Sequence, residues 1–452
     1  MEIEKIDVSE KFCQSTKKEL LPTKHRIMDN ISYLAAFLGG CVSIGTFSMG
    51  ASLIGILNLT QAIVAMAIGC TVIAIALVLS GAAGHKYGIP FTIQARSTFG
   101  ISGVKIPGFL RGIPAIIWFG FQSWVGAGAL NVCFKTLWGF DNLPIVFVAF
   151  TILQIGLAIN GFHGIKWLEN IAVVFILGAL AYMFYSVSTK YGLEVAQKIT
   201  NIKGTWGLPF WGGTTAFLGI YSTMILNGSD YSRELKRKTR PMTTGSLYWL
   251  SILPATIFMG LIGLMVSGGT GNNDPVAVFS TAMDNKLMML ITLSFVAFAQ
   301  VSTNVLNNIV PPVYVLMNTF NMSYKKSVVL VGALSILSCP WLLVRPESAV
   351  GLSLFVQTYS AFLGPIFAVL VVDYFLLRNK KLNLDHYYDL EGPFKGINWA
   401  GILAIIGGSI VSLFFIKISW YASLIPTGLL YYALLKNMKG LSGFRKGTIF
   451  EE

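Results

Sequence analysis

Long apolar stretches, separated by short polar ones, run along nearly the whole chain. A helix needs about 20 mainly apolar residues to cross the hydrocarbon core of a bilayer. On that scale the pattern predicts twelve membrane-spanning helices, near residues 30–57, 60–82, 107–137, 143–162, 165–189, 207–234, 242–268, 287–320, 325–344, 349–377, 398–416 and 418–436. No low-complexity linker or soluble module interrupts this series. We therefore expect one all-α integral membrane domain over about residues 25–437.

Charged residues are scarce and lie mostly on one side of the predicted helices. Only 12% of the 452 residues are charged, about half the share in a soluble domain. The net charge of +13 could indicate a nucleic-acid partner, but its distribution argues for a membrane instead. With the N-terminus inside, all but seven of the 33 Lys and Arg residues fall on the cytoplasmic side; the seven are Lys135, Lys190, Lys198, Lys203, Lys286, Arg345 and Lys417. This positive-inside bias predicts a multi-pass plasma-membrane protein with both termini in the cytoplasm.

The polar segments divide the chain into four parts. We expect a cytoplasmic N-terminal tail (1–25), a ten-helix core (26–378), a cytoplasmic connection with two additional helices (379–437), and a cytoplasmic C-terminal tail (438–452). The N-terminal tail carries charges of both signs and lacks the apolar segment of a signal peptide.

The sequence carries no pattern typical of a metalloenzyme. Its four His and five Cys residues show neither CxxC nor HxxxH spacing, so we expect no transition-metal site and no disulfide framework. A membrane-embedded enzyme would need His pairs or carboxylates at mid-membrane, and the predicted helices place none there. We therefore expect a protein that is not an enzyme and has no organic cofactor.

Two of the predicted helices contain glycines at positions that suggest interruption. The first helix carries Gly39, Gly40 and Gly45, and the sixth carries Gly219 and Gly228. Both contain the string AFLG, five helices apart. Small residues also serve ordinary close packing of helices. The shared AFLG string alone therefore does not decide between helix interruption and close packing. Corresponding interrupted helices in two halves are, however, typical of inverted-repeat transporters and of their midplane binding site.

The stretch WFGFQSWVGAGALN places an aromatic side chain and an amide on one face of the third helix. Trp118 and Gln122 are four residues apart and therefore lie one above the other. With Arg111 near the cytoplasmic end, Trp118 lies about 10 Å and Gln122 about 16 Å further along the helix, near mid-membrane. A flat π surface beside an amide suits a flat, neutral, polar heterocycle. Trp124 fits packing or lipid contact better.

The eighth helix holds the second group of polar side chains. Five of them crowd seven positions: Ser302, Thr303, Asn304, Asn307 and Asn308. Some could only hydrogen-bond neighbouring helices or return a hydroxyl to their own backbone. Two adjacent hydroxyls together with carbonyls freed by an interrupted helix would form an all-oxygen cage, which suits a hard cation such as Na⁺.

The acidic residues bear on the coupling ion. Asp230, Glu234, Asp373 and Glu169 all fall near cytoplasmic helix ends in this topology, and no carboxylate lies clearly at mid-membrane. A proton relay would need one there, so the pattern favours a neutral substrate and Na⁺.

Two of these acids have basic neighbours in sequence. Asp230 is open to two interpretations: a gate or ion-pair latch with Arg233 or Arg237, or a solvated helix end with routine charge pairs. Asp373 with Arg378 allows the same pair of interpretations.

Taken together, these motifs resemble the nucleobase:cation symporter-1 family of cytosine, purine, uracil, allantoin and hydantoin permeases. The resemblance spans nearly all of the helical region and rests on five strings in order: RSTFG (Arg96–Gly100), RGIPAIIWFGFQSW, DYSR (Asp230–Arg233), STNVLNNIVPPVY and VVDYF (Val371–Phe375). It implies a twelve-helix, five-plus-five inverted-repeat (LeuT-like) fold with broken helices 1 and 6, which works by alternating access.

The resemblance also implies roles for individual residues in substrate binding. Trp118 matches the tryptophan that stacks on the substrate ring, and Gln122 matches the glutamine that hydrogen-bonds it. Tyr221 falls at the opposing aromatic position of helix 6, with Ile220 beside it at the break. Asn308 matches an amide that contacts substrate, and Ser43 falls where some relatives place Gln or an aromatic residue.

The same resemblance implies a sodium site. It maps to the backbone carbonyls of Gly39, Val42 and Ala299 and to the hydroxyls of Ser302 and Thr303.

These expectations combine into one functional hypothesis. We expect a secondary transporter that imports a neutral nucleobase or related heterocycle with Na⁺; the DYSR and GTFSMG strings favour the cytosine/purine type. The alternatives are a proton-coupled permease for allantoin, hydantoin, uracil or another small heterocycle, an amino-acid carrier on the same fold, and a non-transporting membrane sensor. The expected partners are the substrate, Na⁺ or H⁺ and the lipid bilayer, without nucleic acid; the oligomeric state stays open.

Overall fold

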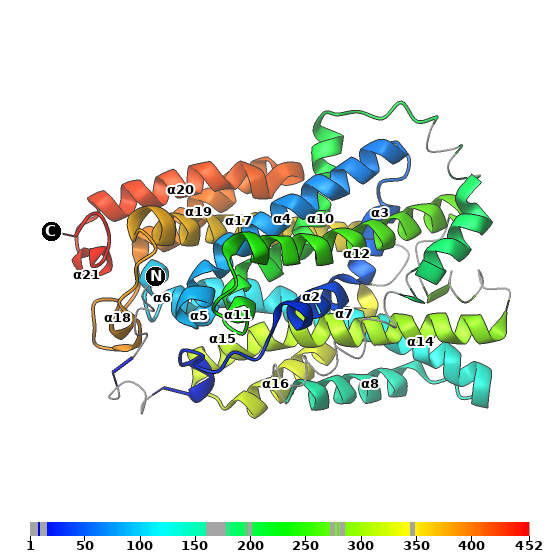
Figure 1. Ribbon diagram of the computed structural model, residues 1–452, viewed down its shortest axis with the longest axis horizontal. Helices are drawn as coiled ribbons and strands as arrows, with labels where there is room; N and C mark the ends of the chain where they lie inside the picture. Colours follow the sequence, from blue (N-terminus) through cyan, green and yellow to red (C-terminus); the bar gives the residue numbers. More distant parts are fainter. Residues whose placement is uncertain are drawn as a thin grey trace.

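The protein is a bundle of long helices that run roughly along one axis (Figure 1). The computed structural model describes residues 8–9, 16–159, 178–179, 181–193, 195, 197, 201–271, 276–277, 280, 285–343 and 349–451. Within these residues six helices are long and apolar enough to cross a membrane, and one bent helix pair adds a seventh. Most of the predicted span 165–189, with Glu169, lies outside the described residues. The all-α membrane architecture is confirmed.

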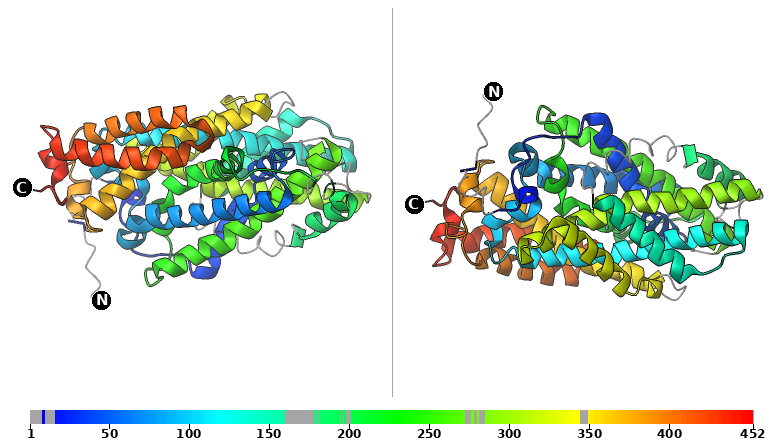
Figure 2. Two further views of the ribbon diagram at one scale, coloured as in Figure 1. Left: turned by 90° about the horizontal axis from the view of Figure 1, so that it is seen from above. Right: turned by 90° about the horizontal axis from the view of Figure 1, so that it is seen from below.

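The helices that position the site come from both halves of the chain. Their bounds are α2 (Asn30–Cys41), α3 (Ile44–Ala51), α4 (Leu59–Tyr87), α7 (Lys105–Trp138), α8 (Leu143–Ala158), α10 (Leu208–Leu226), α11 (Gly228–Ser232), α12 (Pro241–Thr270), α14 (Lys286–Thr303), η2 (Asn304–Ile309), α15 (Val310–Phe320), α16 (Tyr324–Leu337) and α17 (Ala349–Val371). Shorter elements include α5 (Phe91–Gln94), α6 (Arg96–Phe99), η5 (Val372–Leu377), α18 (Leu384–Tyr388) and α21 (Ser442–Arg445). The final pair, α19 (Trp399–Phe414) and α20 (Ser419–Asn437), packs against α17 on one side of the molecule (Figure 2).

The first predicted helix is interrupted, as its glycines suggested. It forms α2 and α3, which meet at an angle of 51°. Val42 and Ser43 between them leave the helical conformation, and the Ser43 side chain accepts a hydrogen bond from the Gly45 N–H to begin α3. A side-chain cap of this kind replaces a missing helical bond at a helix start. The break therefore frees backbone groups in the interior.

The sixth predicted helix is interrupted at a different place from the one expected. α10 continues without a break through Gly219 and Ile220, and the interruption comes at Asn227, before α11. Gly219 instead allows close packing, because a Cβ there would lie 2.7 Å from Val356 Cγ1 of α17. The placement of the break beside Ile220 was therefore wrong, since the glycine serves a helix contact.

α3 and α12 approach so closely that only glycine fits between them. A Cβ on Gly50 would lie 2.0 Å from the carbonyl oxygen of Gly260. We expect Gly50→Ala to lower stability by roughly 1–3 kcal/mol, because overpacking against a backbone atom cannot be relieved by a side-chain rotation. Thermal unfolding of the detergent-purified protein measures this. Gly156→Ala is the control, since nothing lies within 4 Å of its added Cβ; equal melting temperatures for the two variants would contradict the expectation.

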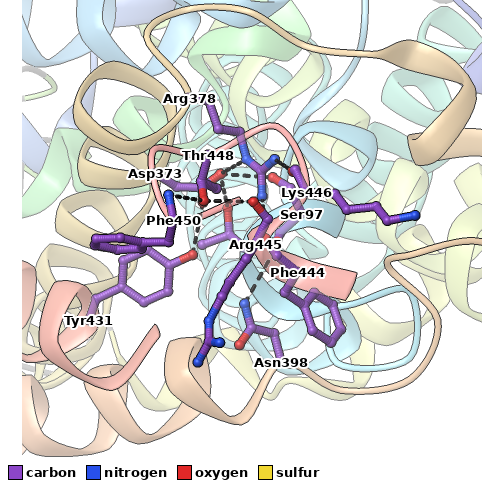
Figure 3. A network of polar contacts seen from close by, with 11 residues as sticks. Ser97, Asp373, Arg378, Asn398, Tyr431, Phe444, Arg445, Lys446, Thr448 and Phe450 are labelled. Atoms are coloured by element: carbon purple, nitrogen blue, oxygen red, sulfur yellow. Dashed lines mark hydrogen bonds and ion pairs between the residues drawn. The ribbon is translucent and has the colours of Figure 1, made fainter. Parts of the chain in front are cut away.

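A buried ion pair spans η5, which directly follows α17, and contacts the C-terminal segment (Figure 3). Arg378 Nε lies 2.8 Å from Asp373 Oδ2, and both side chains are almost fully buried. Tyr431 of α20 and Ser97 of α6 donate hydrogen bonds to the same carboxylate. The predicted pairing of Asp373 with Arg378 is confirmed, but the solvated helix end is wrong.

The guanidinium of Arg378 also holds the C-terminal segment in place. It donates hydrogen bonds to the carbonyls of Lys446, at 2.6 Å, and Phe444, at 2.9 Å. These contacts cover the ion pair with the residues that follow α20. The pair is therefore buried by a segment about 70 positions away in sequence, and its charges are neutralised by each other and by backbone carbonyls.

Removal of one partner of this pair should be strongly destabilising. We expect Arg378→Met to cost about 3–5 kcal/mol, because the Asp373 carboxylate would remain buried without its counter-charge. Lys395→Met is the matched control, since Lys395 pairs with Glu391 at the surface, where such pairs contribute about 0–1 kcal/mol. Thermal melting of both variants decides; a shift for Arg378→Met no larger than that of the control would refute the structural role.

Candidate functional site

A small cavity lies where the α2–α3 interruption faces α7, α10 and η2. All six residues predicted to contact a ring line this cavity; its lining consists of Gly40, Ser43, Trp118, Gln122, Ile220, Tyr221, Thr223, Met224, Thr303, Asn307 and Asn308. None of these side chains is ionisable at neutral pH. The cavity has about 20 Å³ of free volume, room for about one water molecule. A heterocyclic ring therefore fits only if the lining side chains move apart.

Trp118 is held on several sides. Its indole N–H donates a hydrogen bond to the Tyr359 hydroxyl at 3.1 Å, and Phe121 packs edge-on against its ring. Gly45 of α3 lies against the same ring, since a Cβ there would sit 3.1 Å from the indole. Tyr359, from α17, is a supporting residue that the sequence did not reveal. Trp118 is thus fixed in orientation before any ligand arrives.

Gln122 connects three elements at one edge of the cavity. Its amide Nε2 donates to the Ser43 hydroxyl at 3.2 Å, and its Oε1 accepts a longer contact of 3.5 Å from Asn308 Nδ2. A buried amide needs such partners. Ser43, where some relatives have a larger residue, therefore caps α3 and positions Gln122.

The ring of Tyr221 lines the cavity, and its hydroxyl forms hydrogen bonds outside the cavity lining. The hydroxyl donates to the Cys41 carbonyl at 3.2 Å and lies 3.1 Å from the Thr256 hydroxyl. Tyr221 is 1% exposed. The apolar face of this side chain is therefore the part left for a ligand, beside Ile220.

The residues expected to hold a cation come together around the Thr303 hydroxyl. Its Oγ1 lies 3.4 Å from the Gly39 carbonyl oxygen, 3.3 Å from that of Val42 and 3.0 Å from that of Ala299. Ser302 is fully buried next to it. Carbonyl and hydroxyl oxygens are the ligands that hard cations prefer. The donor set fits Na⁺ chemically.

The five polar residues of the predicted eighth helix have different roles in the structure. Asn304 faces away from the cavity lining and donates to Gln154 Oε1 at 2.8 Å, while its own Oδ1 accepts from Asn308. It therefore acts in helix packing, the alternative weighed for this run. Thr303 adjoins the carbonyl oxygens, and Asn307 and Asn308 line the cavity.

A buried arginine supports the same helix from α7. The segment Asn304–Ile309 is a π-helix, and the carbonyl of Asn307 would need a donor four or five residues on, at Pro311 or Pro312. Proline has no N–H. Arg111, fully buried, supplies the missing donor at 2.9 Å. The two prolines in the sequence indicate that a carbonyl lacks its helical N–H donor. The arginine that replaces this donor lies on another helix, so the sequence does not identify it.

The structure bears on two of the interpretations given to Asp230, the ion-pair latch and the solvated helix end. It is completely buried on α11, and it accepts hydrogen bonds from the Phe91 backbone N–H at 2.7 Å and from the Asn227 side chain. Within the described residues it forms no ion pair with Arg233 or Arg237. The solvated helix end is thus wrong for Asp230, because backbone of the Phe91 region, far away in sequence, covers it.

Arg233 is bound instead to the segment that precedes α2. It donates to the Leu21 carbonyl at 3.0 Å and to the Thr23 hydroxyl at 2.7 Å, and it lies over the Tyr314 ring. Glu234 lies 3.7 Å from it. Arg233 therefore fixes the segment around Leu21 and Thr23 against the end of α11.

A family model described as permease for cytosine/purines, uracil, thiamine, allantoin matches residues 21–435 of the chain. The chain belongs to this family. The match covers every helix that forms the cavity, and it makes the protein a membrane transporter and not an enzyme.

Individual relatives agree with this assignment. The chain is 27% identical to a hydantoin permease of Microbacterium maritypicum, over 92% of this chain and 88% of that protein. It is also 27% identical to an allantoin permease of Bacillus subtilis, over 93% of each.

Solved structures confirm the fold. A nucleobase-cation-symport-1 family transporter in a closed conformation with bromovinylhydantoin bound superposes with a TM-score of 0.85 at 26% identity, over 95% of this chain and 99% of that one. A Na⁺-coupled sialic acid symporter shares the fold alone, with a TM-score of 0.63 at 13% identity. The inverted-repeat, LeuT-like fold expected from the motifs is therefore confirmed.

Proposed function

We propose that this permease imports a neutral, planar heterocycle together with Na⁺ by alternating access. The observation that carries the proposal is the convergence of Trp118, Gln122 and Asn308 on one uncharged cavity, directly beside the oxygen cluster around Thr303. An aromatic face stacks on a ring, with a stabilisation of about 1–3 kcal/mol in nucleobase complexes, and amides pair with its edge. A charged ligand would be costly here, because no charged side chain lines the cavity.

The ring itself is proposed as a nucleobase of the cytosine/purine type, as the DYSR and GTFSMG strings suggest. A second candidate is a hydantoin or allantoin, because proteins of those names are among the relatives and a bound hydantoin derivative occupies a structure of the same fold. Both classes present a ring N–H donor together with an acceptor, a ring nitrogen or a carbonyl oxygen, in the plane of the ring. The proposed site serves either chemistry.

The proposed orientation places both termini in the cytoplasm, with the protein in the plasma membrane. Support comes from the N-terminal segment near Leu21, which contacts Arg233, the first residue of the basic string RELKRKTR (Arg233–Arg240), and from α21, which lies at the same end (Figure 1). Basic residues gather on the cytoplasmic side of membrane proteins.

Uptake into proteoliposomes tests the function. Labelled cytosine, adenine, uracil, allantoin and a hydantoin are offered under an inward Na⁺ gradient at equal pH, and under a pH gradient at equal Na⁺. We expect at least one ring to accumulate with the Na⁺ gradient. Accumulation that follows only the pH gradient would replace Na⁺ with H⁺, and lack of counterflow for every ring would support a non-transporting sensor.

A further inference from the structure

The side-chain amide of Asn307 has a fixed orientation at the cavity. Asn307 is 3% exposed and lines the cavity. Its Nδ2 donates a hydrogen bond to the Gly40 carbonyl at 2.8 Å. A carbonyl oxygen only accepts, so the NH₂ group must face Gly40 and the Oδ1 atom must face the other way. That Oδ1 is buried and has no hydrogen-bond partner.

The backbone of Asn307 is equally constrained. Its carbonyl receives the Arg111 guanidinium N–H at 2.9 Å, in place of the N–H groups that Pro311 and Pro312 lack. Contacts at both the backbone and the side chain prevent the residue from turning its unpaired oxygen toward another partner. π-Helical turns of this kind occur frequently at functional sites. Asn307 therefore presents a preorganised acceptor.

Two neighbouring amides, one in the cavity lining and one behind it, differ in this respect. The Gln122 oxygen accepts from Asn308, and the Asn304 oxygen accepts from the same Asn308 amide. The Asn307 oxygen has no such donor, so it is left to be completed by something that enters the cavity. A buried acceptor without a partner is costly, so a ligand with a donor at this place gains from it.

We propose that Asn307 is a specificity-determining residue whose Oδ1 accepts a hydrogen bond from a ring N–H of the substrate. The class of ligand is thereby narrowed to heterocycles with an unsubstituted amide-type or urea-type ring N–H. The inference rests on the proposed function, because it assumes that the ring binds between Trp118 and Gln122. It adds a hydrogen bond to that site, and it requires that the substrate carry an unsubstituted ring N–H.

N-methylation of the ligand tests this rule on the unmodified protein. A ring found to bind is compared with its N-methyl derivatives, one ring nitrogen at a time, by isothermal titration or thermal shift of the purified transporter. A methyl group removes the donor, and we expect methylation of one particular nitrogen to weaken binding by roughly 10- to 100-fold. Equal binding of every N-methyl derivative would overturn the proposal without any mutation.

The Asn307→Ala variant assigns that effect to the residue. It removes the acceptor and leaves space for a methyl group, so the ratio between the parent ring and the sensitive N-methyl derivative should fall to within about threefold. Gln300→Ala is the matched control: Gln300 also has a buried, unpaired side-chain oxygen on the same helix, but it does not line the cavity. The control should keep the wild-type ratio.

The outcomes separate the two proposals. If no ring of the panel binds the wild-type protein, the proposed function fails and this inference fails with it. If rings bind and Asn307→Ala keeps the wild-type ratio, the specificity role alone is overturned. If Asn307→Ala does not fold, the methylation series on the wild-type protein still decides whether the cavity accepts a ring N–H, and Asn307→Ser supplies the replacement variant.

Discussion

Replacement of Trp118 with alanine is expected to abolish saturable binding of the substrate ring. The indole forms one wall of the cavity and is held in place by Tyr359 and Phe121. Its loss removes a stacking surface worth about 1–3 kcal/mol. It also leaves the ring without the wall that aligns its edge with Gln122. We expect a loss of affinity of at least about 100-fold, which puts binding beyond the range of an ordinary titration.

Trp124 provides the control for this experiment. It lies on the same helix and packs against Phe147 and Trp341 with ring centroids 5.2 and 5.6 Å away. It is absent from the cavity lining. Trp124→Ala should therefore lower the melting temperature through lost packing and keep ring binding within about threefold. If Trp118→Ala folds and binds normally, the ring does not occupy this cavity.

Part of the candidate site could be predicted because Trp118 and Gln122 lie on one regular helix. Trp118 and Gln122 share a face by simple helical geometry, and the polar run of the eighth helix had to face the interior. The sequence alone did not show that these helices meet; the family resemblance supplied that step, and the structure places all six predicted ring contacts around one cavity. Periodicity predicts faces, and tertiary packing decides which faces meet.

The incorrect predictions share a different physical cause. Asp230 and Asp373 stand beside basic residues near helix ends, a pattern that is usual for solvated charges. Both are buried because distant backbone closes over them: the Phe91 region for Asp230, and the segment around Lys446 for Asp373. Burial by a segment far along the chain leaves no local signal in the sequence.

The break in the sixth helix was misplaced for a related reason. Gly219 and Gly228 look alike in the sequence, and either could interrupt a helix. Gly219 is needed for contact with α17, while the interruption lies at Asn227, directly before Gly228. A glycine that allows close approach and a glycine beside a break differ only in what lies opposite them.

Removal of the Thr303 hydroxyl is expected to abolish the stimulation of substrate binding by Na⁺. The hydroxyl lies between three carbonyl oxygens, those of Gly39, Val42 and Ala299. Thr303→Val keeps the shape of the side chain and places a methyl group where an oxygen ligand would contact the cation. Coupling between two ligands typically amounts to 5–150-fold in affinity, and we expect this factor to fall to about one.

The coupling is measured as the ratio of substrate affinities with Na⁺ and with a large organic cation in its place. Thr292→Val is the matched control, since Thr292 is buried on the same helix and its hydroxyl has no partner; it should keep the wild-type ratio. Affinity without Na⁺ should be similar in all three proteins, because Thr303→Val keeps the size and shape of the side chain that lines the cavity. A Thr303→Val variant that retains the full Na⁺ effect would place the cation elsewhere. A wild-type protein indifferent to Na⁺, but driven by a pH gradient, would make the oxygen cluster a structural feature of the helix break.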